Sequence, residues 1–422
     1  MKPKLFLALA FWIATTVPPA WAADSNNEHL NRLVAEALEN NPELLEAKAG
    51  VKTVKETPPQ AGSLSDPMLA FEVMNLPTDS FSFSREDMTQ KQISLSQKFP
   101  FPGKLNLQTQ MAQKNVEIME GGYEDLKLRI TRDVKLSFYE LCFILAAIET
   151  TKENQELLKE FIIIAESKYA VGKGIQQDVL KAQVELSQNM EELIQLERDR
   201  NIEQARLNTL LSRLPQAPLT IPHVIQKTPF NYSIEELQKS AEGNHPSLKS
   251  LKSLAERERA SKRLAQREYY PDFDIGFRYG QRDNAIEETR PDMVSAFIGI
   301  NIPLWSKTKQ SRKVAEENFK IEMAQETYKK QRNQIFLQIK ENMDEAAKSQ
   351  KLLDLIKAGI IPQAKQSLES AIAGYTVNKV DFLTLLDNRG ALFKWQIKYH
   401  RELTEYEKTL AKLEQLAGRG LF

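Results

Sequence analysis

The chain has 422 residues, more than one hydrophobic core usually holds, because single cores stop growing beyond about 250 to 300 residues. Charged residues reach 27% and balance to a formal net charge of +0, which excludes the strong basic field of a nucleic-acid-binding protein. Glycine (16) and proline (19) are sparse, so we expect long helices in two halves or in an elongated body.

The first 22 residues have the pattern of a secretory signal peptide. Lys2 and Lys4 precede the apolar run LFLALAFWIA, and small residues surround Trp21 at the expected cleavage site. An uncleaved membrane anchor is the alternative, but the run is shorter than the roughly 20 residues that a spanning helix needs, and two prolines interrupt it. We therefore expect export, with no cysteine after the cleavage site to carry a lipid anchor.

An alternating stretch at residues 69–74 predicts a strand, because Leu69, Phe71 and Val73 would share one face. Residues 92–99 repeat the alternation, with Ile93 and Leu95 on one side. The polar segment 76–88 between them predicts a hairpin with a long loop.

A very long helix is predicted next, because no proline occurs from Gly103 to about Val171. At about 1.5 Å per residue it would extend on the order of 100 Å. Apolar residues from Val134 to Ile148 have the heptad spacing of a coiled coil, and Gly121-Gly122 is a candidate bend. Cys142, the only cysteine, lies in this helix, so disulfides within the chain are excluded.

The chain then repeats itself. After a proline-rich linker at 215–230, the landmarks of residues 23–214 recur in order within 231–422. The turn YAVGKG, which begins at Tyr169, returns as YTVNKV at Tyr375. A second strand pair is predicted at 273–279 and 296–302, separated by the polar loop 281–290, and Pro362 is expected to bend the second long helix.

Two functions of the strands are open at this point. Four strands cannot close a membrane barrel, so several chains would have to share one. Hairpins packed on a soluble core would show the same local alternation. The duplication and the export signal favour the first interpretation, a mainly α protein with a membrane β-barrel part.

Catalytic chemistry has no support in the sequence. The four histidines, His29, His223, His245 and His400, are too far apart along the chain to suggest a metal site. No GxSxG, HExxH, Walker-type or GxGxxG pattern occurs. The carboxylates are scattered along helices, where solvated pairs explain them. We expect no enzyme activity, no bound metal and no cofactor.

The two homologous halves, the segments FPFPGKL (99–105) and INIPLW (300–305) and the two tip turns together resemble the TolC family of outer-membrane efflux proteins. FPFPGK further resembles the branch that serves heavy-metal cation exporters. The resemblance implies a homotrimer in which each chain gives four strands to a 12-stranded barrel and its helices to a periplasmic α-helical tunnel. It also implies outer-membrane lipid as surroundings, and a periplasmic adaptor and an inner-membrane pump as partners.

The resemblance places adaptor contacts and the closing of the channel at the tip turns. In the second turn asparagine stands at the family's glycine position, although asparagine also tolerates a left-handed backbone. The implied contact residues are Tyr169, Val171, Gly172, Lys173 and Gly174 of the first tip, and Tyr375, Val377, Asn378 and Lys379 of the second.

Family members often carry an acidic pore ring just after the second turn. Asp387 matches one such position, Thr384 stands at another, and Asp381 is near enough to contribute charge. Such a ring would favour cations. Alternatively, Asp381 caps a helix and Asp387 simply faces solvent.

The implied function is a passive exit duct of a tripartite efflux or secretion system. A periplasmic coiled-coil adaptor or scaffold is the alternative, although it would need compact all-β domains beside a single hairpin. The cargo stays open among metal ions, drugs and proteins, because a duct need not bind what passes through it.

Overall fold

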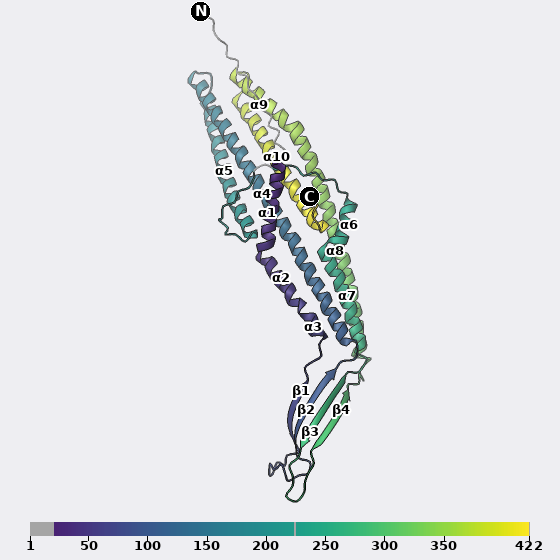
Figure 1. Cartoon of the computed structure of the whole chain (residues 1–422). Helices are drawn as coiled ribbons and strands as arrows, with labels where there is room; N and C mark the ends of the chain where they lie inside the picture. The colour runs from purple at the N-terminus through teal and green to yellow at the C-terminus, as the bar shows by residue number, and fades with distance from the viewer. Residues whose placement is uncertain (1–20, 223–224, 422) are drawn as a thin grey trace, which may run out of the picture.

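The computed structural model describes residues 21–222 and 225–421. It is an elongated molecule with long helices at one end and a four-stranded sheet at the other (Figure 1). The predicted signal peptide lies outside the described residues, except for Trp21 and Ala22. No helix among the residues described combines the length and apolarity that crossing a bilayer requires.

Corresponding elements follow one another in the two halves, with three helices before the first strand pair and two before the second. Asn41 explains one extra break, because it caps α2 and is followed by a proline. The first half comprises α1 (Trp21–Asn40), α2 (Pro42–Lys55), α3 (Thr57–Gly62), β1 (Met68–Met74), β2 (Gln90–Phe99), α4 (Lys104–Ala170) and α5 (Gln176–Leu210). The second comprises α6 (Ile234–Asn244), α7 (Pro246–Arg267), β3 (Phe273–Gln281), β4 (Met293–Ile300), α8 (Gln310–Leu355), the π-helix η1 (Ile356–Ile360), α9 (Ile361–Thr376) and α10 (Phe382–Ala417).

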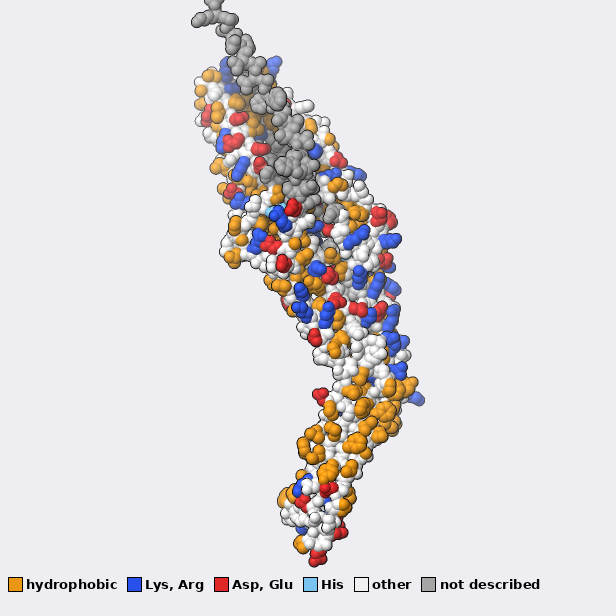
Figure 2. All heavy atoms as spheres, in the orientation of Figure 1, with side chains coloured by type: hydrophobic (Ala, Val, Ile, Leu, Met, Phe, Trp, Pro, Cys, Tyr) orange, Lys and Arg blue, Asp and Glu red, His pale blue; other side chains and the backbone are white. Residues whose placement is uncertain are grey.

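The four predicted strands are confirmed and form one antiparallel sheet in the order β1-β2-β3-β4. The register aligns apolar residues across the sheet: Leu69 pairs with Leu95, which pairs with Phe277. These side chains are exposed, and Figure 2 shows them as a hydrophobic surface over the sheet. One face of the sheet is therefore mainly apolar, as the alternation predicted, and its large apolar side chains are exposed.

The long helix α4 is continuous for 67 residues, or about 100 Å at 1.5 Å per residue. Its heptad positions Val134, Phe138 and Leu141 are buried, as predicted. The helix continues through Gly121 and Gly122. A Cβ on Gly121 would lie 1.9 Å from Ser250 Oγ and 3.2 Å from the backbone oxygen of Pro246, so this glycine lets α7 approach α4 closely.

The second long helix is interrupted where Pro362 predicted an irregularity. The π-helix η1 ends two residues before Pro362, which occupies the first turn of α9. Proline has no N–H to donate and its ring clashes with the carbonyl four residues earlier. The wider π turn accommodates this locally, so α8, η1 and α9 form one path toward the second tip.

The linker between the halves is fastened by a buried carboxylate. Glu407 of α10 accepts hydrogen bonds from the Thr228 backbone N–H at 2.7 Å and from its hydroxyl at 2.8 Å. Tyr406 also donates its hydroxyl to the Thr228 carbonyl at 3.0 Å. Burial raises the pKa of Glu407 to about 6, so this contact puts a partly desolvated charge in the helical body.

The adjacent glycines provide a matched test of helix packing. We predict that Gly121→Ala lowers the stability by about 1–3 kcal/mol through overpacking against α7. Gly122→Ala, whose Cβ would meet nothing within 4 Å, should be neutral or stabilising because alanine favours helix. Thermal unfolding followed by circular dichroism in detergent compares the two. Equal melting temperatures would contradict the close contact of α4 with α7.

Candidate functional site

The first tip is a helix C-terminus closed by a left-handed glycine. Gly172 has φ +69°, and its N–H donates to the Tyr169 carbonyl at 3.0 Å. The Lys173 N–H donates to the Lys168 carbonyl at 2.9 Å. This pair of hydrogen bonds is a Schellman motif, which satisfies two of the last carbonyls of α4 and reverses the chain into α5.

The second tip has the same backbone with asparagine in place of glycine. Asn378 has φ +62°, and its N–H donates to the Tyr375 carbonyl at 3.1 Å. The Lys379 N–H donates to the Gly374 carbonyl at 2.9 Å. Asparagine tolerates a left-handed backbone, and Asn378 adopts one here.

Each turn also needs one small residue, but at opposite ends. In the first tip a Cβ on Gly174 would lie 3.1 Å from the Cβ of Lys168. In the second, a Cβ on Gly374 would lie 2.5 Å from Cγ2 of Val380. The large side chain thus precedes the first turn and follows the second.

Lys168, the large side chain that precedes the first turn, connects the two tips. Its ammonium donates to the Tyr375 carbonyl and to Asn378 Oδ1, the latter at 2.6 Å. It also lies 3.9 Å from the centroid of the Tyr375 ring, within the range of a cation–π interaction. A cation at the end of α9 complements the negative end of that helix. The two halves are therefore joined at their tips by charge-assisted hydrogen bonds and a cation–π contact.

The predicted contact residues differ in exposure. Val171 is 67% exposed, Val377 62% and Tyr169 50%, and Lys173 and Lys379 are also exposed. Tyr375, by contrast, is only 5% exposed. Its ring packs against Phe382 with centroids 5.4 Å apart, so its role in this chain is to fill the core of the second tip.

The three pore-ring candidates lie at one end of α10. Asp381 is the N-cap, and its Oδ1 accepts from the Thr384 N–H at 2.7 Å. This hydrogen bond holds the pKa of Asp381 below its usual value. Thr384 and Asp387 are exposed and, at a spacing of three, share a helix face. Asp387 also lines a cavity of about 600 Å³ between α5 and α10.

A second acid faces this end of α10 from the first tip. Asp178 lies in the first turn of α5, as expected of an N-terminal charge. Partial burial, followed by the negative charge of Asp381, raises the pKa of Asp178. The α5 and α10 N-termini therefore bring two carboxylates close together, which concentrates negative charge beside the tips.

Arg389 of α10 connects the second helical hairpin to α4 and α5 of the first, on the side of the tips nearer the sheet. It is 6% exposed and donates to Asn154 Oδ1 of α4 at 3.3 Å and to Glu185 Oε2 of α5 at 2.7 Å. Burial lowers the pKa of Arg389, and the Glu185 charge opposes that shift. Removing one partner of such a buried pair leaves an uncompensated charge, so this contact restricts how α10 can move.

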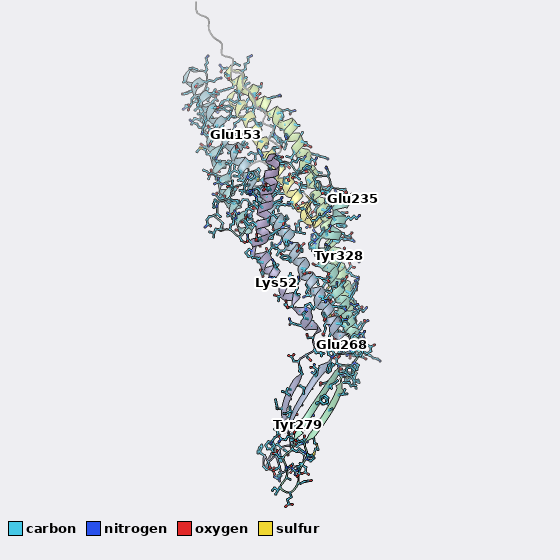
Figure 3. All side chains as sticks on the ribbon, viewed as in Figure 1. Lys52, Glu153, Glu235, Glu268, Tyr279 and Tyr328 are labelled. Atoms are coloured by element: carbon cyan, nitrogen blue, oxygen red, sulfur yellow. The ribbon has the colours of Figure 1, made fainter. Side chains whose placement is uncertain are left out.

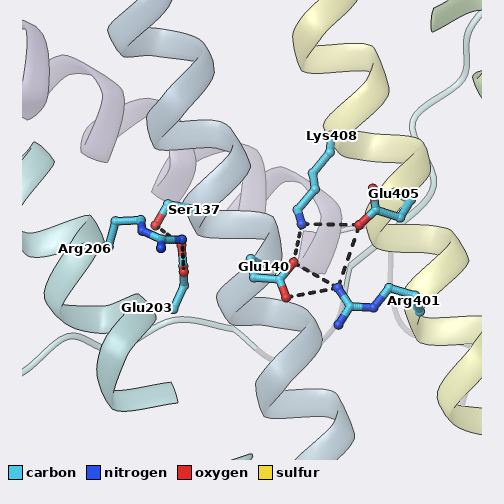
Figure 4. Close-up of polar contacts among 7 residues, drawn as sticks. All are labelled: Ser137, Glu140, Glu203, Arg206, Arg401, Glu405 and Lys408. Atoms are coloured by element: carbon cyan, nitrogen blue, oxygen red, sulfur yellow. Dashed lines mark hydrogen bonds and ion pairs between the residues drawn. The ribbon is translucent and has the colours of Figure 1, made fainter. Parts of the chain in front are cut away.

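A larger ion network joins the halves in the middle of the body (Figure 4). Glu140 of α4 accepts both from Arg401, at 3.0 Å, and from Lys408 of α10. Although burial raises the pKa of Glu140, the Lys408 and Arg401 cations outweigh it and hold the pKa below its usual value. Beside it, the Ser137 hydroxyl donates to Glu203 at 2.6 Å. These groups line a cavity of about 700 Å³. Because they hydrogen-bond with one another, they form a structural network.

Sequence reasoning missed Lys168 and Arg389. Lys168 corresponds to Gly374 in the repeat, and a lysine opposite a glycine marks a position where the halves differ. Arg389 lies on the same helix face as the buried Leu385 and Leu386, and an arginine on an apolar face signals a buried partner. Both signals were present in the sequence, but neither identifies the partner.

This architecture matches a known protein family. Residues 33–213 and 237–419 match the model of the family described as Outer membrane efflux protein. The cobalt-zinc-cadmium resistance protein CzcC of Cupriavidus metallidurans is 21% identical over 350 residues, covering 82% of this chain and 81% of CzcC. Toxin and drug export protein A of Aggregatibacter actinomycetemcomitans is also 21% identical, covering 74% of this chain and 69% of its own.

Solved structures share the fold over nearly the whole chain. The outer membrane protein VceC of Vibrio cholerae superposes with a TM-score of 0.80 at 19% identity, covering 96% of this chain and 99% of VceC. CusC superposes with a TM-score of 0.77 at 18% identity, covering 96% of each chain. The mainly helical fold with one four-stranded sheet is thus the fold of these outer-membrane channels.

The contact of Lys168 with the second tip is testable without a functional assay. We predict that Lys168→Met increases amide hydrogen exchange in residues 374–380 by up to about tenfold, because a charge-assisted hydrogen bond is lost. Lys173→Met, which changes an exposed lysine of the same turn, should leave exchange there unchanged. Hydrogen exchange read by mass spectrometry compares them, and identical exchange in both variants would show that Lys168 does not hold the tip.

Proposed function

Because the chain belongs to the outer membrane efflux protein family, we propose that it is the outer-membrane channel of a tripartite efflux or secretion system. In this proposal three copies each contribute four strands to a 12-stranded barrel and their helices to a tunnel through the periplasm. Cargo diffuses through the tunnel, and the chain carries out no bond chemistry.

The observation that carries the proposal is the uncovered apolar face of the sheet. Val294, Ile298 and Phe71 are each more than 70% exposed, in a sheet that packs no helix against that face. Hydrocarbon is the solvent that such a face matches. The two central strands, β2 with 10 residues and β3 with 9, have the length of tilted membrane-spanning strands.

The edges of the sheet support sharing between copies. β1 and β4 are each paired on one side only, and unpaired backbone groups are costly in hydrocarbon. The opposite face suits a water-filled lumen, because it carries Ser94, Ser96, Gln92 and Arg278. Pairing β4 of one copy with β1 of the next removes both edges and encloses this polar face.

The exposed turns support adaptor docking at the far end. Val171 and Val377 project from two turns of the same backbone geometry, and the elongated body places both far from the sheet (Figure 1). We assign the adaptor contact to Tyr169, Val171, Gly172, Lys173 and Gly174 and to Val377, Asn378 and Lys379, while Tyr375 supports the second turn from inside. An inner-membrane pump would supply the cargo through that adaptor. The alternative, a periplasmic adaptor, would need compact all-β domains, which the described residues do not contain.

For cargo we propose heavy-metal cations. The similarity to the cobalt-zinc-cadmium resistance protein CzcC supports this assignment, as does the exposed Asp387 near the mouth. Asp387 with Thr384, and Asp381 behind them, would give three copies of an acidic group around the neck. Toxin and drug export protein A is an equally distant relative, so export of larger molecules is the outcome that a metal-transport assay must exclude.

The assembly is tested on the purified chain. We predict a trimer that requires detergent and sits in the outer-membrane fraction, because the apolar face of the sheet is otherwise exposed to water. Size-exclusion chromatography with light scattering measures the mass, and planar bilayers measure conductance. A soluble periplasmic monomer without conductance would contradict the proposal.

The ring is tested by charge removal. We predict that Asp387→Asn lowers the preference of the channel for cations over anions, since three negative charges leave the neck. Asp344→Asn, on the exposed side of α8, is the control and should leave selectivity unchanged. Reversal potentials in a salt gradient should be measured below about 0.1 M, where charges are screened less. Unchanged selectivity in Asp387→Asn would exclude this residue from the ring.

A further inference from the structure

Side-chain contacts hold the sheet to the helices at their junction. The Lys104 ammonium donates to Asp272 Oδ1 at 2.7 Å, and the Phe101 N–H donates to the same oxygen at 2.7 Å. Phe101 also stacks on Tyr270 with ring centroids 4.5 Å apart. The end of β2 and the start of β3 are therefore held together where α4 begins, which fixes the level at which the apolar sheet ends.

Aromatic and apolar side chains mark the same level after β4. Ile302 is 66% exposed, and Leu304 and Trp305 are each 74% exposed. The backbone of this segment is ordered by turns, because the N–H groups of Thr308 and Lys309 both donate to the Trp305 carbonyl. Tryptophan is enriched where hydrocarbon meets headgroups. Trp305 thus lies at the border of the apolar face.

Basic side chains follow Trp305 directly. Lys307, Lys309 and Arg312 are exposed, and none of them forms an ion pair within the described part of the chain. Residues 301–315 contain no acid at all. The exposed carboxylate of Glu268 lies nearby at the junction (Figure 3), and Arg263 and Arg267 precede it on α7. Asp272, the other acid named at this junction, is paired with Lys104, so the cations outnumber the acids there.

We propose that Lys307, Lys309 and Arg312 form a surface that binds the headgroups of acidic phospholipids in the leaflet nearest the helices. The inference rests on the proposed function, because it requires the sheet to lie in a bilayer. If Trp305 lies at the hydrocarbon border, the cations a few residues farther along lie at the depth of the phosphates. Long basic side chains reach such phosphates while their stems cover apolar surface.

The apolar residues beside the three cations favour a lipid as the bound molecule. A soluble polyanion would be attracted by the charges but would gain nothing from Leu304 and Trp305. An acidic phospholipid satisfies both, because its phosphate meets the cations and its acyl chains meet the apolar residues. Each cation near an anionic membrane surface strengthens binding about fivefold. Three cations together can therefore make this surface prefer acidic over neutral phospholipids.

Quenching of Trp305 by brominated lipid tests this surface. Trp395→Phe leaves Trp305 as the one tryptophan outside the predicted signal peptide. The trimer is reconstituted in mixed bilayers in which either phosphatidylglycerol or phosphatidylcholine is brominated. We expect phosphatidylglycerol to quench preferentially, and 0.5 M salt to reduce the preference. In the Lys307→Gln/Lys309→Gln/Arg312→Gln variant the preference should fall at least about fivefold.

A control variant changes the same number of exposed basic residues on the helical body, Lys351→Gln/Lys357→Gln/Lys365→Gln, and should keep the preference. Equal quenching by both lipids in the parent chain, or equal loss of preference in the two variants, would overturn the lipid site while leaving the channel intact. Failure of the chain to enter bilayers, with Trp305 unquenched by either lipid, would instead contradict the proposed function.

Discussion

Antiparallel pairing of β2 with β3 is the constraint on which the rest of the molecule depends. It aligns Lys91 with Gln281 and Phe99 with Phe273, and so joins the two halves through backbone hydrogen bonds. Because α4 starts at Lys104 and α7 ends at Arg267, the same pairing sets α4 beside α7 for the length of the lower body. Gly121 then permits close packing of α4 against α7. The side-chain contacts nearer the tips therefore hold helices that the strand pairing has already aligned.

The two halves share their backbone and differ in the side chains that connect them. Both tips use a Schellman turn, yet only the first supplies Lys168, and only the second supplies a buried tyrosine to receive it. Likewise Arg389 of α10 reaches α4 and α5, while its counterpart in the first half is Gln183. The duplicated helices thus make different contacts through a few charged residues.

The helical body and the sheet are suited to different solvents. In the helical body charges are paired across elements, as Glu140 is with Arg401 and Lys408, and apolar residues are buried. In the sheet the apolar residues are outside. This inversion, together with membership in the outer membrane efflux protein family, supports a molecule whose helical body lies in water and whose sheet lies in hydrocarbon. The charged surface after Trp305 lies at the boundary between the two.

The sequence by itself determined the elements that depend on local pattern. Alternation at Leu69 and Ile298 predicted strands, the missing prolines predicted the length of α4, and the repeat predicted a second turn after Tyr375. The sequence also implied the family and most of the tip residues. Only the tertiary structure decided that Tyr375 is buried, that Lys168 binds the opposite tip and that Arg389 reaches Asn154. Periodicity reports which side of one element is apolar, whereas the Lys168 and Arg389 contacts join residues 210 and 235 positions apart, and their partners are fixed only once the helices are packed.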